Sequence, residues 1–355
     1  MDLTAWEMTA IGEPLKKVAR KDVKPGPREV VIEVAGCGVC HTDLGFLFDG
    51  VPTRHPLPLV LGHEIAGRVV ACGANEHFWM DADVIVPAVI PCGECEVCRR
   101  GRGTICPHQI FPGNDLDGGF ATHVVVPARG LCRVPPNRRK AIDLAVLAVV
   151  ADAVTTPYQA CLRSAVGPGD LAIFVGIGGV GAFGVQIARA MGAVVVAIDI
   201  DPKKLERVAA HGAALVVDSS KTSEKDIKKT IRAFAKERGL PAVMWKIFET
   251  SGAPAGQQLA FSLLVHGATL SVVGYTPKKV EVPLSHLMAF DAVAQGNWGC
   301  LPENYPGALE LVLSGKVDVE PFIERRPLSS INEALASIHR HECTRRVVLV
   351  PDAVA

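Results

Sequence analysis

A glycine-rich turn between an apolar strand and an apolar helix is the feature that most constrains the fold of this 355-residue chain. The strand is expected at residues 171–175 and the helix runs on through Ala190. The turn between them contains Gly176, Gly178, Gly179, Val180 and Gly181, in the pattern Gly-x-Gly-x-x-Gly. Glycines in this position let backbone N–H groups approach a pyrophosphate at the positive end of the helix. The sequence therefore predicts a dinucleotide site, although a turn that only packs a helix on a strand would share the pattern.

The segments that follow the turn alternate between strand and helix patterns. Apolar runs predict strands at 194–199, 214–218, 243–248 and 269–274, and amphipathic stretches predict helices from Pro202 and over 223–239. Regular alternation of this kind is typical of a doubly wound parallel sheet of the Rossmann type. We therefore expect an α/β nucleotide-binding domain over residues 156–298.

The first 150 residues have a different character. Short β-branched runs at 30–34, 66–70, 83–87 and 122–126 lie between glycines and prolines. Such runs predict an irregular β-barrel, so residues 1–155 are expected to form a separate domain with a cysteine-rich lobe at 91–107. Beyond residue 299, a helical stretch at 306–314 and a strand at 346–350 show no strand-helix-strand rhythm, and residues 299–355 are expected to return to the first domain.

The lobe contains Cys92, Cys95, Cys98 and Cys106. Four thiols at this spacing suit one tetrahedral zinc ion, and a zinc ion with four thiolates has no open position for a substrate. Two disulfides or a redox pair are the alternatives, and both are disfavoured in a chain that we expect to be cytoplasmic. A zinc ribbon on nucleic acid is also disfavoured, because Lys+Arg and Asp+Glu number 37 each.

A second set of metal donors lies earlier in the chain. Cys40 and His63 supply a thiol and an imidazole, and Asp43 and Glu64 are carboxylates beside them. A catalytic zinc site needs three protein ligands and one open position.

The chain resembles the medium-chain, zinc-dependent alcohol dehydrogenases over nearly its whole length. The resemblance rests on Cys40-His41-Thr42-Asp43, Gly62-His63-Glu64, the four-cysteine lobe and the glycine turn, which occur in the family's order. It implies a GroES-like catalytic domain, a Rossmann domain, and two zinc ions per chain, one catalytic and one structural. It also implies that Cys40 and His63 are catalytic zinc ligands.

The third ligand position departs from the family. The resemblance places Asp152 where relatives most often have cysteine, and a carboxylate is a legitimate zinc ligand. An acid that faces elsewhere, with Glu64, Cys37 or water completing the site, is the alternative. Cys37 is otherwise expected to be a packed core residue.

The resemblance also assigns roles around the metal. Asp43 and Glu64 resemble carboxylates that orient His63 and modulate the metal, and Thr42 resembles the hydroxyl that relays the substrate proton to the nicotinamide ribose. Gly45 stands where some relatives end the relay on a histidine, so the proton must leave through water or another group.

The cofactor is expected to be NAD. Asp199 ends the strand after the glycine helix, where a carboxylate binds the ribose diol and repels a 2′-phosphate, although Asp201 competes for this role. The resemblance adds three cofactor-binding residues, His41, Lys204 and Arg346.

A narrower resemblance concerns the substrate. The segments 113–123, 149–158 and 296–302 are similar to those of 6-hydroxycyclohex-1-ene-1-carbonyl-CoA dehydrogenases of anaerobic benzoyl-CoA breakdown. This implies oxidation of a ring alcohol on a CoA thioester to a conjugated ketone. Because the alkene of such a ketone is electrophilic, we also hypothesise a secondary 1,4-addition of water to that product; a site that excludes water and only transfers hydride is the alternative. Cations for the CoA phosphates cannot be chosen from the sequence among Arg54, Arg99, Arg100, Arg102, Lys278 and Lys279.

Two other functions stay open: a generic secondary-alcohol or polyol dehydrogenase, and a non-catalytic nucleotide-binding zinc protein. Zero formal charge favours neither nucleic acid nor an anionic membrane as a partner, and no apolar run reaches the length of a membrane span. The family resemblance implies a homo-oligomer, either a dimer or a tetramer.

Overall fold

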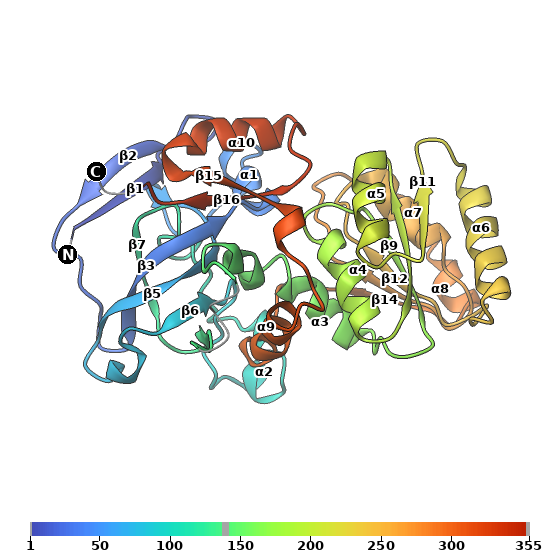
Figure 1. The fold of residues 1–355 in the computed structure, drawn as a ribbon, viewed down its shortest axis with the longest axis horizontal. Coiled ribbons are helices and arrows are strands. Elements are labelled where there is room, and N and C mark those ends of the chain that lie inside the picture. Colours follow the sequence, from blue (N-terminus) through green and yellow to red (C-terminus); the bar gives the residue numbers. More distant parts are fainter. Residues whose placement is uncertain (1, 137–141, 353–355) are drawn as a thin grey trace. The chain divides into compact units, whose positions relative to one another are not determined.

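The computed structural model describes residues 2–136 and 142–352 of the chain. Two compact units are present (Figure 1). Unit 1 comprises Met1–Thr155, Gly299–Leu313 and Val319–Ala355, and unit 2 comprises Thr156–Trp298 and Ser314–Asp318. Among the described helices, none combines the length and the apolar character needed to cross a membrane.

Unit 1 is built on two β-sheets. The smaller sheet has the order β2-β1-β4, and the described strands of the larger sheet have the order β15-β16-β3-β5-β6-β8, with β7 paired to β3. The smaller sheet comprises β1 (Leu3–Met8), β2 (Lys16–Arg20) and β4 (Leu59–Val60). The larger sheet comprises β3 (Glu29–Gly38), β5 (Glu64–Cys72), β6 (Asp83–Val86), β7 (His123–Pro127), β8 (Cys132–Arg133), β15 (Ile323–Pro327) and β16 (Arg346–Val350).

Strand β3 is the centre of the larger sheet. It pairs antiparallel with β5, β7 and β16. Its residues Val30, Val31 and Ile32 are completely buried, because apolar side chains cover both faces of the strand. The end of β3 leads directly into the first metal-donor segment, so the central, largely buried strand of the larger sheet fixes the position of Cys40.

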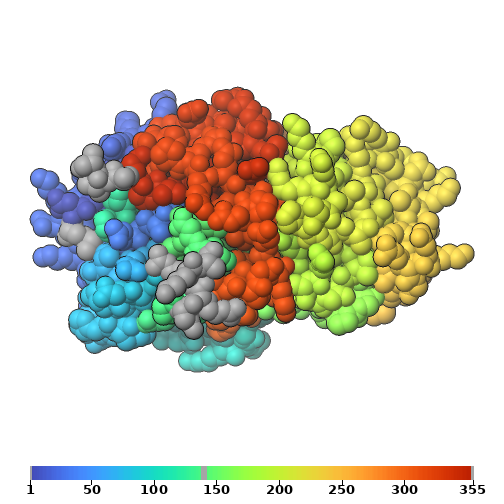
Figure 2. Space-filling view, viewed as in Figure 1, coloured from blue at the N-terminus to red at the C-terminus, as the bar shows by residue number. Residues whose placement is uncertain are grey.

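The C-terminal return contains a strand-helix-strand unit, contrary to the expectation from the sequence. Strand β15 pairs parallel with β16, and α10 (Ile331–His339) connects them. Val347 and Leu349 of β16 join the same apolar core as Val30 and Ile32 of β3. In the space-filling view the red C-terminal residues lie against the blue and green parts of unit 1 (Figure 2).

Short helices connect the strands of unit 1. The α-helices besides α10 are α1 (His41–Leu47), α2 (Glu96–Arg99) and α9 (Tyr305–Leu313). The described 3-10 helices are η1 (His77–Trp79), η2 (Gly103–Ile105), η4 (Val146–Ala151), η5 (Pro302–Asn304), η6 (Glu320–Phe322) and η7 (Leu328–Ser330).

Unit 2 contains one parallel sheet of the order β11-β10-β9-β12-β13-β14. The strands are β9 (Leu171–Val175), β10 (Val194–Asp199), β11 (Leu215–Asp218), β12 (Lys246–Glu249), β13 (Thr269–Val272) and β14 (Val293–Gly296), and neighbouring strands pair in parallel. The direction of winding reverses between β9 and β12, and ligands of such sheets bind beyond the carboxyl ends of the strands at this point.

Helices cover both faces of the sheet in unit 2 (Figure 1). The helices are α3 (Thr155–Arg163), α4 (Gly181–Ala190), α5 (Pro202–Ala210), α6 (Glu224–Glu237), α7 (Pro254–Ser262) and α8 (Ser285–Ala289). Ile227 and Ile231 of α6 share an apolar core with Ile173 of β9, whereas Gly184 of α4 lies against Phe174. Since neighbouring residues of a strand point to opposite faces, α4 and α6 lie on opposite sides of β9.

Candidate metal centre and nucleotide site

The structure brings Cys40, His63, Glu64 and Asp152 together, with their donor atoms all within 4.8 Å of one another. Cys40 Sγ lies 3.7 Å from Asp152 Oδ2, and His63 Nε2 lies 3.5 Å from the same oxygen. Zinc bonds of about 2.1 Å to N and O and about 2.3 Å to S would place tetrahedral donors roughly 3.4 to 3.6 Å apart. The three donor atoms therefore fit one zinc ion, and Asp152 lies where the sequence predicts the third ligand.

Each donor is held by a different element of unit 1. Cys40 is the N-cap residue of α1, and its backbone N–H donates to Asp43 Oδ2 at 2.9 Å. His63 comes immediately before β5, and Asp152 follows η4 in a non-helical conformation with φ −143° and ψ −56°. Only the tertiary fold brings these three segments together.

Asp43 connects the first two donor segments. Its completely buried carboxylate accepts a hydrogen bond from Gly62 N at 3.2 Å, and the same oxygen lies 3.3 Å from His63 Nδ1. The ring of His63 thus presents Nε2 to Asp152 and Nδ1 to Asp43. The contact to Asp43 has ion-pair distance without hydrogen-bond geometry, and it lies where an outer carboxylate orients a metal-ligating histidine.

Only glycine fits at position 62, directly before His63. Its φ is +96°, and a Cβ there would lie 2.6 Å from the ring of Phe120 and 2.8 Å from Cys37 Sγ. Cys37 is itself fully buried in the apolar core. The geometry therefore places Cys37 as a packing residue rather than as a member of the donor group.

The donor group attracts positive charge. Burial alone would lower the pKa of His63, yet the carboxylates of Asp43 and Asp152 raise it well above its ordinary value. A zinc ion would satisfy the same demand for positive charge, so the electrostatics of the site fit a bound cation as well as its geometry does.

Glu64 and Arg346 form a buried pair beside the donors. Arg346 Nε donates to Glu64 Oε2 at 2.7 Å, and Nη2 donates to Oε1. Burial raises the pKa of Glu64 to about 7, although the guanidinium opposes this shift. The sequence predicts a cofactor contact for Arg346, and the structure turns its guanidinium onto Glu64.

Thr42 and His41 occupy the first turn of α1. Thr42 Oγ1 lies 3.7 Å from Cys40 Sγ, so its hydroxyl is beside the donor group. His41 is exposed at the start of the same helix. The relay role of Thr42 and the cofactor role of His41 remain predictions.

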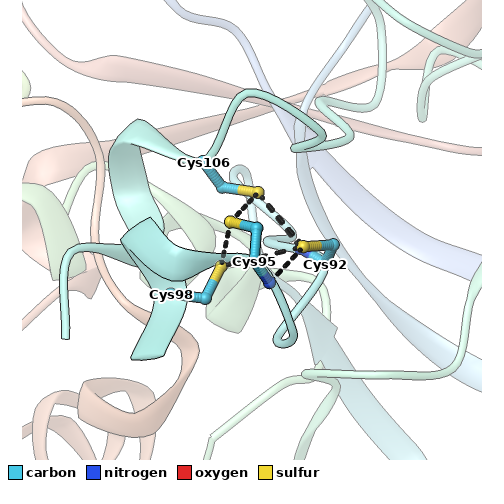
Figure 3. A group of neighbouring side chains, drawn as sticks. All are labelled: Cys92, Cys95, Cys98 and Cys106. Atoms are coloured by element: carbon cyan, nitrogen blue, oxygen red, sulfur yellow. Dashed lines mark hydrogen bonds between the residues drawn. The ribbon is translucent and has the colours of Figure 1, made fainter. Parts of the chain in front are cut away.

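The cysteine lobe contains a second donor set (Figure 3). The sulfur atoms of Cys92, Cys95, Cys98 and Cys106 approach one another at 3.5 to 3.9 Å. A disulfide needs about 2.05 Å, whereas tetrahedral zinc thiolates lie roughly 3.8 Å apart. Backbone N–H groups of Glu94 and Cys95 lower the pKa of Cys92 to about 6, which favours the thiolate that zinc requires.

In unit 2 the glycine turn is packed against the loop after β12. Gly176 has φ +93°, and a Cβ there would lie 2.5 Å from Ser251. Thr250 Oγ1 donates to Gly176 O at 2.6 Å. The role of Thr250 is not visible in the sequence, because nothing in the local pattern shows that two loops 74 residues apart are neighbours.

Asp199 and Asp201 differ in their contacts. Asp199 Oδ2 accepts a hydrogen bond from Ile177 N, inside the glycine turn, at 2.5 Å. Asp201 caps α5 and accepts from Lys203 N at 2.9 Å. Lys204 lies half-buried in the first turn of α5. The carboxylate that faces the glycine turn is therefore that of Asp199.

The chain combines a parallel sheet of the kind that binds nucleotides with two groups of side chains that suit zinc. This combination defines a zinc-binding dehydrogenase. Family comparison agrees: residues 26–136 match the alcohol dehydrogenase GroES-like domain, and residues 179–314 match the zinc-binding dehydrogenase domain. The chain belongs to the zinc-dependent medium-chain alcohol dehydrogenase family, and it has that family's GroES-like and Rossmann-like parts.

Individual relatives cover nearly the whole chain. An alcohol dehydrogenase of Geobacillus stearothermophilus is 32% identical over 337 residues, which is 94% of each chain. A sorbitol dehydrogenase of Bacillus subtilis is 28% identical over 90% of each chain. The crystal structure of an alcohol dehydrogenase from Thermotoga maritima superposes with a TM-score of 0.88 at 26% identity, covering 99% of this chain and 100% of that one.

Proposed function

We propose that the chain oxidises a cyclic secondary alcohol carried on a CoA thioester, with NAD as the hydride acceptor. The observation that carries the dehydrogenase part of the proposal is the donor set of Cys40, His63 and Asp152 beside the hydroxyl of Thr42. A zinc ion in this set would supply Lewis-acid polarisation of an alcohol or ketone oxygen. Thr42, whose Oγ1 lies 3.7 Å from Cys40 Sγ, is proposed to take the hydroxyl proton while it passes its own proton on to the nicotinamide ribose. Asp43, 3.3 Å from His63 Nδ1, is proposed to orient the imidazole.

The proposed substrate is 6-hydroxycyclohex-1-ene-1-carbonyl-CoA, which becomes 6-oxocyclohex-1-ene-1-carbonyl-CoA. Support comes from the location of the three segments that carry the narrower resemblance. Gly119 N donates to Gly62 O and Phe120 N donates to Leu61 O, so the first segment borders His63. The second segment contains Asp152 itself. Cys300 of the third segment is buried close enough to Asp152 for that carboxylate to add to the rise of its thiol pKa.

NAD is the proposed cofactor because Asp199 faces the glycine turn while Asp201 serves as a helix cap. A carboxylate at this place binds the ribose diol and repels a 2′-phosphate. Among the candidate cations for the CoA phosphates, Arg54 is paired with Asp115 and Arg100 is paired with Glu96.

A turnover screen with purified, metal-loaded protein tests the proposal. The CoA ester, the corresponding free acid and cyclohexanol are compared with NAD and with NADP. Contacts to CoA position the reacting carbinol, so the free acid should lose kcat as well as affinity. If kcat/KM for the free acid equals that for the CoA ester, the CoA proposal is wrong. The protein would then be a generic secondary-alcohol or polyol dehydrogenase, the class of the sorbitol dehydrogenase relative.

The same site is proposed to add water to its ketone product. In the product the ring alkene is conjugated to both the ketone and the thioester, so its far carbon accepts the oxygen of water and the carbon beside the thioester accepts a proton. No net oxidation or reduction occurs. Incubation of the ketone with enzyme should give a gain of one water by mass, and a rate equal to that of zinc-depleted protein would contradict the proposal.

A homo-oligomer is proposed to form through the edge strand β14. This strand ends the sheet of unit 2, and Val293 on it is 55% exposed, as are Leu284 (68%) and Met288 (78%) nearby in sequence. Unpaired, apolar strand edges favour pairing with another chain. Light scattering should show a dimer or tetramer that Val293→Lys weakens, and an unchanged mass of the variant would exclude this edge. A cytoplasmic location remains a prediction.

A further inference from the structure

Two hydroxyl groups converge on one carbonyl next to the carboxylate zinc donor. Tyr305 Oη donates to Ala151 O at 2.5 Å, and Thr155 Oγ1 donates to the same oxygen at 3.2 Å. Ala151 is the last residue of η4, and Asp152 follows it. The carbonyl that receives both hydrogen bonds therefore belongs to the peptide group that leads into Asp152.

This peptide group controls where the carboxylate can reach. The peptide unit is planar, so fixing the Ala151 carbonyl also fixes the N and Cα atoms of Asp152. An aspartate side chain is short and has only two side-chain torsions with which to correct a misplaced backbone. Metal-ligand distances tolerate errors of only about 0.2 Å. A rotation of the Ala151–Asp152 peptide would thus move the donor oxygen out of range of Cys40 and His63.

Tyr305 is itself held in place. Its hydroxyl accepts a hydrogen bond from Ala88 N at 3.0 Å, and its side chain is completely buried at the start of α9. Burial raises its pKa well above the ordinary value, so the hydroxyl keeps the proton that it donates to Ala151. The single hydroxyl therefore links the residues after β6, the end of η4 and α9.

We propose that Tyr305 is a positioning residue for Asp152, acting through the Ala151 carbonyl, with Thr155 as a second and longer contact to the same oxygen. The C-terminal return thereby sets the geometry of the catalytic metal site although it supplies none of the three donors. This inference rests on the proposed function, specifically on Asp152 being a zinc ligand.

The test compares the variants Tyr305→Phe and Asp152→Ala with the unchanged full-length protein. Zinc affinity is measured by competition with a chromogenic chelator, and ligand geometry is measured from the visible absorption of the cobalt-substituted catalytic site. Removing a partner of a metal ligand typically costs about 10- to 100-fold in metal affinity. Tyr305→Phe should therefore weaken the catalytic zinc by that factor and shift the cobalt spectrum, while the lobe zinc stays bound.

Ser164→Ala is the matched control, because it removes a buried hydroxyl that bonds to Ser271 Oγ at 2.8 Å in unit 2. It should lower thermal stability without changing zinc affinity or the cobalt spectrum. Thr155→Val removes the longer contact to Ala151 O, and it should shift the same spectrum by less. It also keeps the inference testable if Tyr305→Phe folds poorly.

The outcomes separate this inference from the function on which it rests. If Asp152→Ala loses the catalytic zinc but Tyr305→Phe and Thr155→Val behave like Ser164→Ala, the positioning role is wrong and the ligand set stands. If Asp152→Ala keeps both zinc ions at full affinity, the ligand set is wrong and the role of Tyr305 falls with it. Substrate identity enters neither readout.

Discussion

Arg346 and Glu64 form a two-bonded, buried ion pair across 282 positions of the sequence. The arginine side chain is 5% exposed and the glutamate side chain is not exposed at all. The pair ties β16, the final strand of the C-terminal return, to β5 at the residue that follows His63. The return thus supplies both a charge partner and, through Tyr305, a hydrogen bond to the surroundings of the metal donors.

Replacing Arg346 by leucine should destabilise the fold strongly. The Glu64 carboxylate would remain buried without its cation, and removing one partner of a buried ion pair typically costs about 3–5 kcal/mol. Urea denaturation measures the free energy of unfolding. Arg346→Lys keeps the charge and loses the two-bonded geometry. Its free energy of unfolding should therefore lie between those of the unchanged protein and Arg346→Leu. A stable Arg346→Leu variant with greatly weakened NAD binding would instead support the cofactor contact expected from the sequence.

Cys95→Ser should remove the zinc ion of the lobe and lower stability, with the catalytic reaction affected less directly. The substitution takes one of four sulfurs from a closed site, and structural zinc sites contribute directly to folding. The zinc content measured by metal analysis should fall from two ions per chain to one, and the melting temperature should fall as well. Cys72→Ser, at the end of β5 and outside both donor sets, is the control and should keep both ions. Two zinc ions in Cys95→Ser would contradict the assignment.

Asp199→Gly should narrow the preference for NAD over NADP. The change removes the carboxylate that faces the glycine turn and that would repel a 2′-phosphate. The ratio of kcat/KM for the two cofactors is the measurement. Asp201→Ala removes a helix cap worth roughly 1 kcal/mol and should lower stability while leaving the ratio unchanged. The opposite pattern, with only Asp201→Ala changing the ratio, would exchange the roles of these two residues.

The sequence predicts the interior of this fold better than its edges. Strands such as β9 and β10 are continuous apolar runs that are buried on both faces, so their limits are visible in the sequence. The sequence does not predict strands β14 and β15, because the first is largely exposed and the second, with the sequence Ile-Glu-Arg-Arg-Pro, carries three charged residues. The hydrogen bonds of such edge strands come from a partner strand that local composition does not reveal.

The same distinction applies to the site. The positions of Cys40, His63 and Asp152 could be inferred because their residue types suit zinc and their neighbours resemble a known family. The pairing of Glu64 with Arg346, and the bond from Tyr305 to Ala151, span 282 and 154 positions. No spacing rule predicts them, because each depends on how the C-terminal return packs on β5 and η4.

Acidification should destabilise unit 1 partly through His123 in β7. Burial lowers the pKa of His123, and Glu33, which lies opposite it on β3, partly offsets this shift. Because the folded-state pKa lies below the unfolded value of about 6.5, the unfolded chain takes up the proton first as pH falls. The contribution of His123 to stability is therefore present above about pH 6.5 and is lost progressively below it. Urea denaturation at pH 7.5 and 5.5 should show a smaller loss of stability in His123→Gln than in the unchanged protein. Glu33→Gln removes the group that favours the imidazolium, so it should make the loss larger, and equal losses in all three proteins would show that His123 does not contribute.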